Sequence, residues 1–472
     1  METKKKHGFT SSLGFVLAAA GSAVGVGNIW RFPYLAARDG GGVFLLVYLI
    51  LVLTFGFTLL TTDIALGRRT GQHAWYAFGS LHPSWSFLGK LTFLVPTMIM
   101  TYYSVIGGWV LKYLVVYVTG QHQAAAQDDF FTSFISSPVA SVVFMLVFLA
   151  FTAFVVYAGV EKGVERFSKL VMPGLLLLVI AIAIYSLTLS HTDADGTIRT
   201  GMQGLMVYLK PDFTGMTFSR FLNILLDAMS QLFFSLSVSM GIMITYGSYV
   251  KKDVNLNKSI AQVEFFDTAV AFLAGIMIIP AVFVFSGMEG MGSGPSLMFI
   301  SLPKVFNSMG VAGIIVGILF FVMILFAALT SCISIMETLV ATCMNLFHKS
   351  RKTTSLLITV YAAITASIIS LGYSVFYFNI TLPNGNPAQL LDIMDYASNS
   401  FLMPLIAFLT AIFVGWVIRP DWISEEMRVG SPKGFPMEKL YRVMVRYIFP
   451  AIMALLFLQS TGLLTWLLGQ FS

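Results

Sequence analysis

The chain has 472 residues, 57% of them hydrophobic and 11% charged, with a mean hydropathy of +0.83 and a net charge of +6. This composition excludes a soluble globular domain and indicates a protein that crosses a membrane several times. The sequence has no phosphate-binding loop, no zinc-ligand spacing and no nucleophile beside a base, so ATP-driven transport and enzyme activity are not expected. The excess of basic residues is explained by their accumulation in loops on one side of the membrane, so it implies no nucleic-acid partner.

Eleven apolar runs are long enough to span a bilayer. Their centres lie near residues 25, 54, 102, 148, 178, 234, 272, 328, 363, 405 and 458. Loops on one side hold 21 of the 28 basic residues and loops on the other side hold five, which predicts a cytoplasmic N-terminus. With eleven spans, the C-terminus is expected outside the cell. We therefore expect a multi-pass protein of the cell membrane, in contact with the lipid bilayer.

The runs divide the chain into five parts. We expect a cytoplasmic segment at 1–12, five helices at 13–190, an external loop at 191–217, five more helices at 218–418, and a cytoplasmic loop with an eleventh helix at 419–472. Two sets of five helices suit an inverted repeat.

The first run, Leu13–Ala37, is interrupted near its middle by Gly21, Gly25, Gly27 and Asn28. Unwinding there frees carbonyls and amides at bilayer depth, which is tolerated only where they bind something or line a cavity. Close packing of small residues against another helix is the alternative. Arg31 favours the binding site, because an intramembrane cation costs roughly 2.5–3.5 kcal/mol and needs a partner or a water-filled path.

Polar groups in the next runs give weaker signals. Asp63 ends the second run near the cytoplasmic edge, where an interfacial acid is as much expected as a functional one. Tyr103 lies at mid-depth in the third run, where its hydroxyl needs a hydrogen-bond partner. The charged link 161–166 is interpreted as a solvated connector without chemistry.

The sixth run, Phe218–Val250, is interrupted by Gln231, by Ser230, Ser235, Ser237 and Ser239, and by Gly241. Runs one and six hold the same place in the two sets of five. Broken helices in matching positions are the best sequence sign of a binding site in an inverted-repeat transporter.

Three further positions extend this pattern. Asp267 in the seventh run is expected to be an ion ligand or to be paired. In the eighth run, the hydroxyls of Thr330 and Ser331 either bond back to their own helix or serve as hard oxygen ligands for a small cation. Asp395, before the tenth run, lies at the level expected for Arg31, so these opposite charges form a candidate gate.

The two cysteines, Cys332 and Cys343, both fall in the eighth run. Two residues eleven apart on one helix cannot form a disulfide. We interpret both as packing residues.

The stretch from Gly21 to Tyr34, GSAVGVGNIWRFPY, followed by three glycines at 40–42, resembles the first-helix signature of the neurotransmitter:sodium symporters, which include the bacterial leucine transporter. The similarity extends through residues 231–237, through Leu329-Thr330-Ser331 and across the order of the spans. It implies an all-α integral membrane protein with a leucine-transporter-like 5+5 inverted repeat, broken helices 1 and 6, and one extra helix. It also implies a bacterial inner-membrane symporter that couples amino acids to Na+ by alternating access, without an organic cofactor.

The resemblance further implies two sodium sites with all-oxygen shells. The first would use Ala23, Asn28, Ser235, Asp267 and the substrate carboxylate. The second would use Gly21, Val24, Ala327, Thr330 and Ser331.

The resemblance also implies an amino-acid site between the broken helices. The carboxylate would meet the amides of Val26 and Gly27 and the Tyr103 hydroxyl, at the positive end of a helix dipole. The ammonium would face Ala23, Phe234, Ser235 and Ser237. The side-chain pocket would consist of Ile99, Phe234, Ser239, Met240, Ser331 and Ile335, and the outer gate of Arg31 and Asp395.

At two positions this sequence differs from other members of the family, and both differences concern the transported substrates and ions. Gly25 stands where monoamine carriers have an Asp, which implies an α-amino acid, and Met240 suits a hydrophobic or aromatic side chain. Asp267 stands where chloride-using animal members have a neutral Asn, which implies chloride independence.

At the inner gate, Lys6 replaces an Arg, Phe9 replaces a Trp, and Asn345 stands where an acid is expected. The pattern of the family is therefore broken at this gate. A second hypothesis is an amino-acid sensor that transports little, which binding without flux would favour.

Overall fold

The computed structural model describes residues 8–192, 196–292, 294–383 and 387–463. The described chain is helical apart from loops and two short hairpins. Strands β1 (Ser190–Thr192) and β2 (Ile198–Thr200) form one hairpin, and β3 (Ile380–Thr381) and β4 (Pro387–Ala388) form the other. The expectation of an all-α protein therefore holds for the spans but not for these loops.

Nine helical segments in the described part of the chain are long and apolar enough to cross a membrane. They are α3–α4 (Gly42–Leu51 and Phe57–Thr70), α6 (Ser86–Val118), α9 (Pro138–Tyr157), α10 (Arg166–Leu187), α14 (Leu256–Ser286), α16 (Val311–Phe347), α17 (Arg351–Leu371), α18–α19 (Leu390–Asp395 and Met403–Ile412) and α21–α22 (Glu438–Val443 and Phe449–Ser460). Single π-helical segments join the two halves of each paired span, at Val52–Gly56, Tyr396–Leu402 and Met444–Ile448.

The first and sixth runs are broken, as predicted. Helices α1 (Ser12–Ala23) and α2 (Val26–Arg38) meet at an angle of 54°. The sixth run forms α12 (Phe218–Ser235) and α13 (Ile242–Ser248), with a nonhelical stretch at 236–241 between them. Each of the eleven apolar runs therefore has a helical counterpart.

The last span begins earlier than its apolar run. The apolar run begins at Tyr447 in the sequence, but the helix begins at Glu438. The Glu438 carboxylate accepts hydrogen bonds from Arg428 at 2.7 Å and from Arg442 at 2.5 Å, so the charges of this extra turn compensate one another. The predicted run beyond residue 463 lies outside the described residues.

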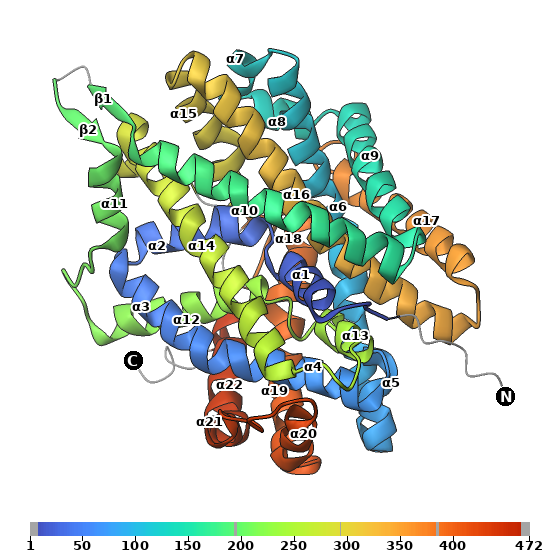
Figure 1. The fold of residues 1–472 in the computed structure, drawn as a ribbon. Helices are drawn as coiled ribbons and strands as arrows, with labels where there is room; N and C mark the ends of the chain where they lie inside the picture. Colours follow the sequence, from blue (N-terminus) through green and yellow to red (C-terminus); the bar gives the residue numbers. More distant parts are fainter. Residues whose placement is uncertain (1–7, 193–195, 293, 384–386, 464–472) are drawn as a thin grey trace.

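Shorter helices connect the spans. They are α5 (Ala74–Leu81), α7 (His122–Ala125), α8 (Phe130–Ile135), α11 (Gly201–Leu209), α15 (Leu302–Ser308) and α20 (Pro420–Arg428). Figure 1 shows α1 and α2 in the middle of the bundle, where α1 packs on α10, α14 and α16, and α2 on α12 and α14. The breaks in α1–α2 and α12–α13 thus lie inside the protein.

Helix α13 is cut off from α12 and is positioned by α4 instead. An ideal Cβ at Gly67 would lie 1.9 Å from the Ile244 carbonyl oxygen, and one at Gly247 would lie 2.3 Å from the Ile64 carbonyl oxygen. Only glycine permits this backbone contact on both sides. The two helices therefore pack as one unit.

We predict that Gly67→Ala destabilises the protein by about 1–3 kcal/mol, because the new methyl group displaces the α13 backbone. The melting temperature is measured by heating the detergent-solubilised protein to a series of temperatures and determining the remaining folded fraction by size-exclusion chromatography. Gly174→Ala in α10 is the matched control, since its Cβ would meet only the Phe326 ring at 3.8 Å. Equal melting temperatures for the two variants would contradict the packing argument.

Candidate functional site

The break between α1 and α2 exposes backbone groups to nearby hydroxyls. The Gly25 amide donates to Asn28 Oδ1 at 3.1 Å, and the amides of Val26 and Gly27 begin α2, where the helix dipole is positive. An ideal Cβ at Gly25 would lie 3.1 Å from Ser331 Oγ and 3.3 Å from Tyr103 Oη. Two hydroxyls therefore approach this break closely.

The break between α12 and α13 contains two strained serines. Ser237 and Ser239 adopt the left-handed conformation, with φ of 52° and 60°, which costs roughly 1–2 kcal/mol per residue. Ser237 Oγ donates to the Ser22 carbonyl at 2.9 Å, and the Ser239 amide donates to Asp63 Oδ2 at 3.0 Å. These bonds tie the second break to α1 and to α4.

Asp63 therefore differs from an interfacial acid. Its side chain is buried, with 3% exposure, and its contact lies across the bundle at Ser239. The contact gives this acid a structural role, because it ties α4 to the second break.

A buried hydrogen-bond network joins the two broken helices to α14. Asn28 Nδ2 donates to Ser235 Oγ at 2.9 Å and to Asp267 Oδ1 at 2.8 Å. Ser235 Oγ lies 2.8 and 2.9 Å from the two Asp267 carboxylate oxygens. The Asp267 and Asn28 side chains are inaccessible to solvent.

This network carries a negative charge without a basic partner. Among the described residues, no Lys or Arg forms an ion pair with Asp267, which is held by neutral donors alone. Glu264, one turn away on α14, is also buried, and its Oε1 has no hydrogen-bond partner. An isolated buried carboxylate is costly, so this region favours a bound cation.

Three of the four protein ligands predicted for the first sodium site are thus in mutual contact. The fourth, the Ala23 carbonyl, ends α1 and lies 3.9 Å from an ideal Cβ at Gly25. In the described chain, no three His, Cys, Asp or Glu side chains form a cluster that could hold a metal. The donor set here is one of mixed oxygens, which suits a hard cation.

The residues predicted for the second sodium site lie where α1 packs against α16. An ideal Cβ at Gly21 would lie 3.2 Å from Thr330 Cβ. Thr330 Oγ1 bonds back to its own helix, to the Ala327 carbonyl at 3.1 Å, whereas Ser331 Oγ donates across to the Ser22 carbonyl at 3.1 Å. Val24 follows α1 directly.

The residues predicted to contact substrate surround the same two breaks. The Phe234 ring lies against Gly27, where an ideal Cβ would be 2.4 Å from the ring. Tyr103, Ile99, Met240 and Ile335 are all buried, as are the two strained serines. The two cysteines of α16 are free and buried, as expected of packing residues.

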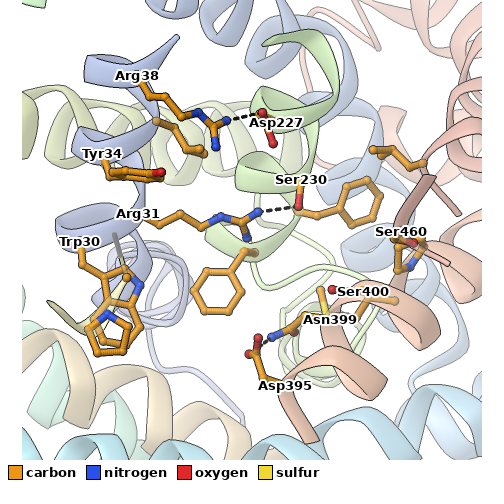
Figure 2. A pocket seen from close by; sticks show the side chains of 18 residues that line it. Trp30, Arg31, Tyr34, Arg38, Asp227, Ser230, Asp395, Asn399, Ser400 and Ser460 are labelled. Atoms are coloured by element: carbon orange, nitrogen blue, oxygen red, sulfur yellow. Dashed lines mark hydrogen bonds and ion pairs between the residues drawn. The ribbon is translucent and has the colours of Figure 1, made fainter. Parts of the chain in front are cut away.

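A cavity of about 390 Å³, here called the vestibule, opens beside Phe234. Figure 2 shows its polar lining: Trp30, Arg31, Tyr34, Arg38, Asp227, Ser230, Asp395, Asn399, Ser400 and Ser460. Arg31 and Asp395 both line it, but no ion pair joins them in the described structure. Arg31 donates instead to Ser230 Oγ at 2.7 Å.

At the opposite end of the bundle, the structure describes two of the three predicted inner-gate residues, Phe9 and Asn345. Lys6 lies outside the described residues, Phe9 is buried against Tyr246 and Tyr249, and Asn345 is exposed. The ring centroid of Phe9 lies 5.4 Å from that of Tyr246 and 6.1 Å from that of Tyr249.

An ion pair that the sequence analysis missed lies beside these rings. The Glu337 carboxylate is fully buried and pairs with Arg351, and it accepts a hydrogen bond from Tyr249 Oη at 2.9 Å. Arg351 also donates to the Val156 carbonyl at 2.9 Å. The sequence does carry one sign of this pair, because Glu337 is an acidic residue inside the otherwise apolar helix α16.

The link at 161–166 is only in part a solvated connector, because 161, 162 and 166 are exposed and 163–165 are buried. Its residue Glu165 has 2% exposure and accepts hydrogen bonds from the Thr10 amide at 2.8 Å and from Lys169 at 2.6 Å. The carboxylate thereby fixes the chain just before α1. Its partner Thr10 is 155 residues away in sequence, so the link alone gave no sign of this contact.

Comparisons with known proteins place the chain among membrane transporters. The sequence pattern of the sodium:neurotransmitter symporter family matches residues 6–133 and 130–466. YhdH of Bacillus subtilis, an uncharacterized sodium-dependent transporter, is 35% identical over 478 residues, which cover 99% of this chain and 100% of YhdH. An uncharacterized sodium-dependent transporter of Haemophilus influenzae is 31% identical over 472 residues, which cover 97% of this chain and 98% of that one.

The crystal structure of MhsT in complex with L-phenylalanine has a TM-score of 0.83 to this structure and is 37% identical in sequence, covering 97% of this chain and 100% of MhsT. The protein is therefore a multi-span, sodium-dependent transporter with an MhsT-like helical fold, and not an enzyme. It belongs to the sodium:neurotransmitter symporter family.

We predict that Asp267→Asn raises the sodium concentration needed for half-maximal thermal stabilisation at least about tenfold, because it removes the buried charge but keeps the side-chain shape. Melting curves at increasing NaCl, with KCl added to constant ionic strength, measure this. Asp129→Asn, in an exposed loop, is the control and should leave the curve unchanged. An unaltered sodium dependence in Asp267→Asn would exclude this carboxylate as a ligand.

Proposed function

We propose that this protein is a sodium-coupled symporter of hydrophobic or aromatic amino acids that works by alternating access. The observation that carries the proposal is the Asp267 carboxylate, which is buried between both broken helices without a basic partner among the described residues. A cation bound there would compensate its charge. Na+ suits a shell of carboxylate, hydroxyl, amide and carbonyl oxygens.

Two sodium ions would accompany the amino acid. The first would be held by Ala23, Asn28, Ser235, Asp267 and the substrate carboxylate, and the second by Gly21, Val24, Ala327, Thr330 and Ser331. Because the substrate carboxylate would complete the first shell, sodium and amino acid would each strengthen the binding of the other.

The substrate would lie between the two breaks. Its carboxylate would accept from the amides of Val26 and Gly27 and from Tyr103, at the positive end of α2. Its ammonium would face the strained segment that contains Ser237. The crystal structure of the related MhsT with L-phenylalanine supports an aromatic side chain, for which Ile99, Met240 and Ile335 supply apolar contacts.

Gly25 supports an α-amino acid over an amine without a carboxylate. A side chain there would meet Ser331 Oγ and Tyr103 Oη, both within 3.3 Å of an ideal Cβ. An acidic residue would thus occupy the place proposed for the substrate carboxylate.

We further propose a leucine-transporter-like 5+5 inverted repeat with an external vestibule and a cytoplasmic N-terminus, in line with the distribution of the basic residues. Each Na+ that enters down an inside-negative membrane potential of about 100 mV contributes about 2.3 kcal/mol to accumulation. The permanent charge of Asp267 would make chloride unnecessary.

Proteoliposomes test the proposal. We predict that an inward sodium gradient drives uptake of labelled L-phenylalanine, L-tyrosine or L-leucine above the level seen with potassium, because sodium entry is coupled to substrate entry. Replacing chloride by gluconate should leave this uptake unchanged.

Lysine, whose charged side chain does not suit the apolar pocket, is the matched negative substrate. Sodium-dependent binding without uptake would replace the symporter by the sensor hypothesis, and loss of uptake in gluconate would refute chloride independence.

A further inference from the structure

The two arginines of α2 contact α12 and not the acid across the vestibule. Arg31 Nη2 donates to Ser230 Oγ at 2.7 Å, and Arg38 forms an ion pair with Asp227 (Figure 2). Asp227 and Ser230 are three residues apart on α12, so they lie on one face of that helix. The two contacts hold α2 against α12 along one wall of the vestibule.

The opposite wall of the vestibule carries an acidic side chain that neighbouring residues hold in a fixed orientation. Asp395, at the end of α18, accepts a hydrogen bond from Asn399 Nδ2 at 2.7 Å, and the same amide group donates to Tyr102 Oη at 2.9 Å. Figure 2 shows Asp395 and Asn399 facing the vestibule across from Arg31. These bonds orient the carboxylate while leaving it without a basic ion-pair partner among the described residues.

The two arginines are held with different strength. Arg38 has carboxylate partners on both sides, Asp227 and Asp39, the latter at 2.7 Å. Among the described residues, Arg31 forms a side-chain hydrogen bond only with the neutral Ser230 hydroxyl, and no carboxylate is within ion-pair distance of it. A hydrogen bond between two charged groups is stronger than one to a neutral acceptor, so the contact of Arg31 is the one that can be exchanged.

We propose that Ser230 is a positioning residue that holds Arg31 on the open side of the vestibule, in competition with the Arg31–Asp395 outer gate that the resemblance to the symporter family implies. Arg38 and Asp227 stay paired and act as the anchor of α2. This inference rests on the proposed function, because closure of the vestibule is a step of alternating access. A neutral acceptor at position 230 keeps the open and closed arrangements close in free energy.

Three variants at one position test this competition, because they change the open arrangement in opposite directions. Ser230→Ala removes an acceptor that only the open arrangement uses, so L-phenylalanine should bind about two- to fivefold more tightly in saturating sodium. Ser230→Asp gives Arg31 a charged acceptor in the open arrangement and should weaken binding about tenfold or more. Ser230→Thr keeps the hydroxyl and should behave as the wild type.

A second measurement reports how accessible the vestibule is to a reagent in solution. Ser400→Cys places a reactive thiol on the vestibule lining, while the native cysteines are buried. In sodium without amino acid, a charged methanethiosulfonate reagent should modify this thiol more slowly with Ser230→Ala and faster with Ser230→Asp. Ser460→Ala is the matched control: this serine lines the same vestibule but bonds to the Phe457 carbonyl of its own helix at 3.1 Å.

Two results would overturn the inference. One is a change in the same direction for Ser230→Ala and Ser230→Asp, which indicates a merely structural serine, and the other is an unchanged modification rate in both. If the wild type binds no amino acid in sodium, the proposed function fails. The thiol measurement needs no substrate, so it still decides whether Ser230 holds the vestibule open.

Discussion

The Asp267 carboxylate accepts hydrogen bonds from Asn28 of α2 and from Ser235 of α12, at 2.8 Å each, in a region closed to solvent. One acid of α14 therefore fixes both broken helices relative to each other. Among the described residues no base neutralises it, and a buried charge of this kind is stabilised only by further donors or by a cation. The arrangement makes the geometry of both breaks depend on what compensates this carboxylate.

The second break is also strained, and hydrogen bonds to α1 and α4 hold that strain. Ser237 and Ser239 hold left-handed conformations because the Ser22 carbonyl and Asp63 receive their hydrogen bonds, and Ser22 also accepts from Ser331 of α16. A cation or an amino acid that enters between the breaks meets groups that are already oriented. Preorganised oxygens and amides reduce the cost of ordering that binding otherwise incurs. The vestibule on one side and the Glu337–Arg351 pair on the other flank this centre.

The two breaks were predictable from sequence because glycines, serines and polar side chains cluster in otherwise apolar runs at matching places. The partners of those breaks were less predictable. Asp63 and Glu337 were visible as acids in apolar helices, but periodicity does not say which helix an acid faces. Glu165 lies in a charged link that looks solvated, and only tertiary packing brings Thr10 to it. Ser230 was one serine among several, and its contact with Arg31 depends on how α2 crosses α12. Charge pairing around Glu438 similarly extends the last span beyond its apolar run.

The most direct test of a sodium-dependent amino-acid site centred on Asp267 is equilibrium binding of L-phenylalanine to the purified wild-type protein in NaCl and in KCl at equal ionic strength. We expect saturable binding in sodium and none in potassium. We also expect that phenylalanine lowers the half-saturating sodium concentration by the same factor by which sodium raises the affinity for phenylalanine, because the coupling is reciprocal. Equal binding of phenylalanine in the two salts would contradict this, because no sodium ion bound at Asp267 would then take part in recognising the substrate.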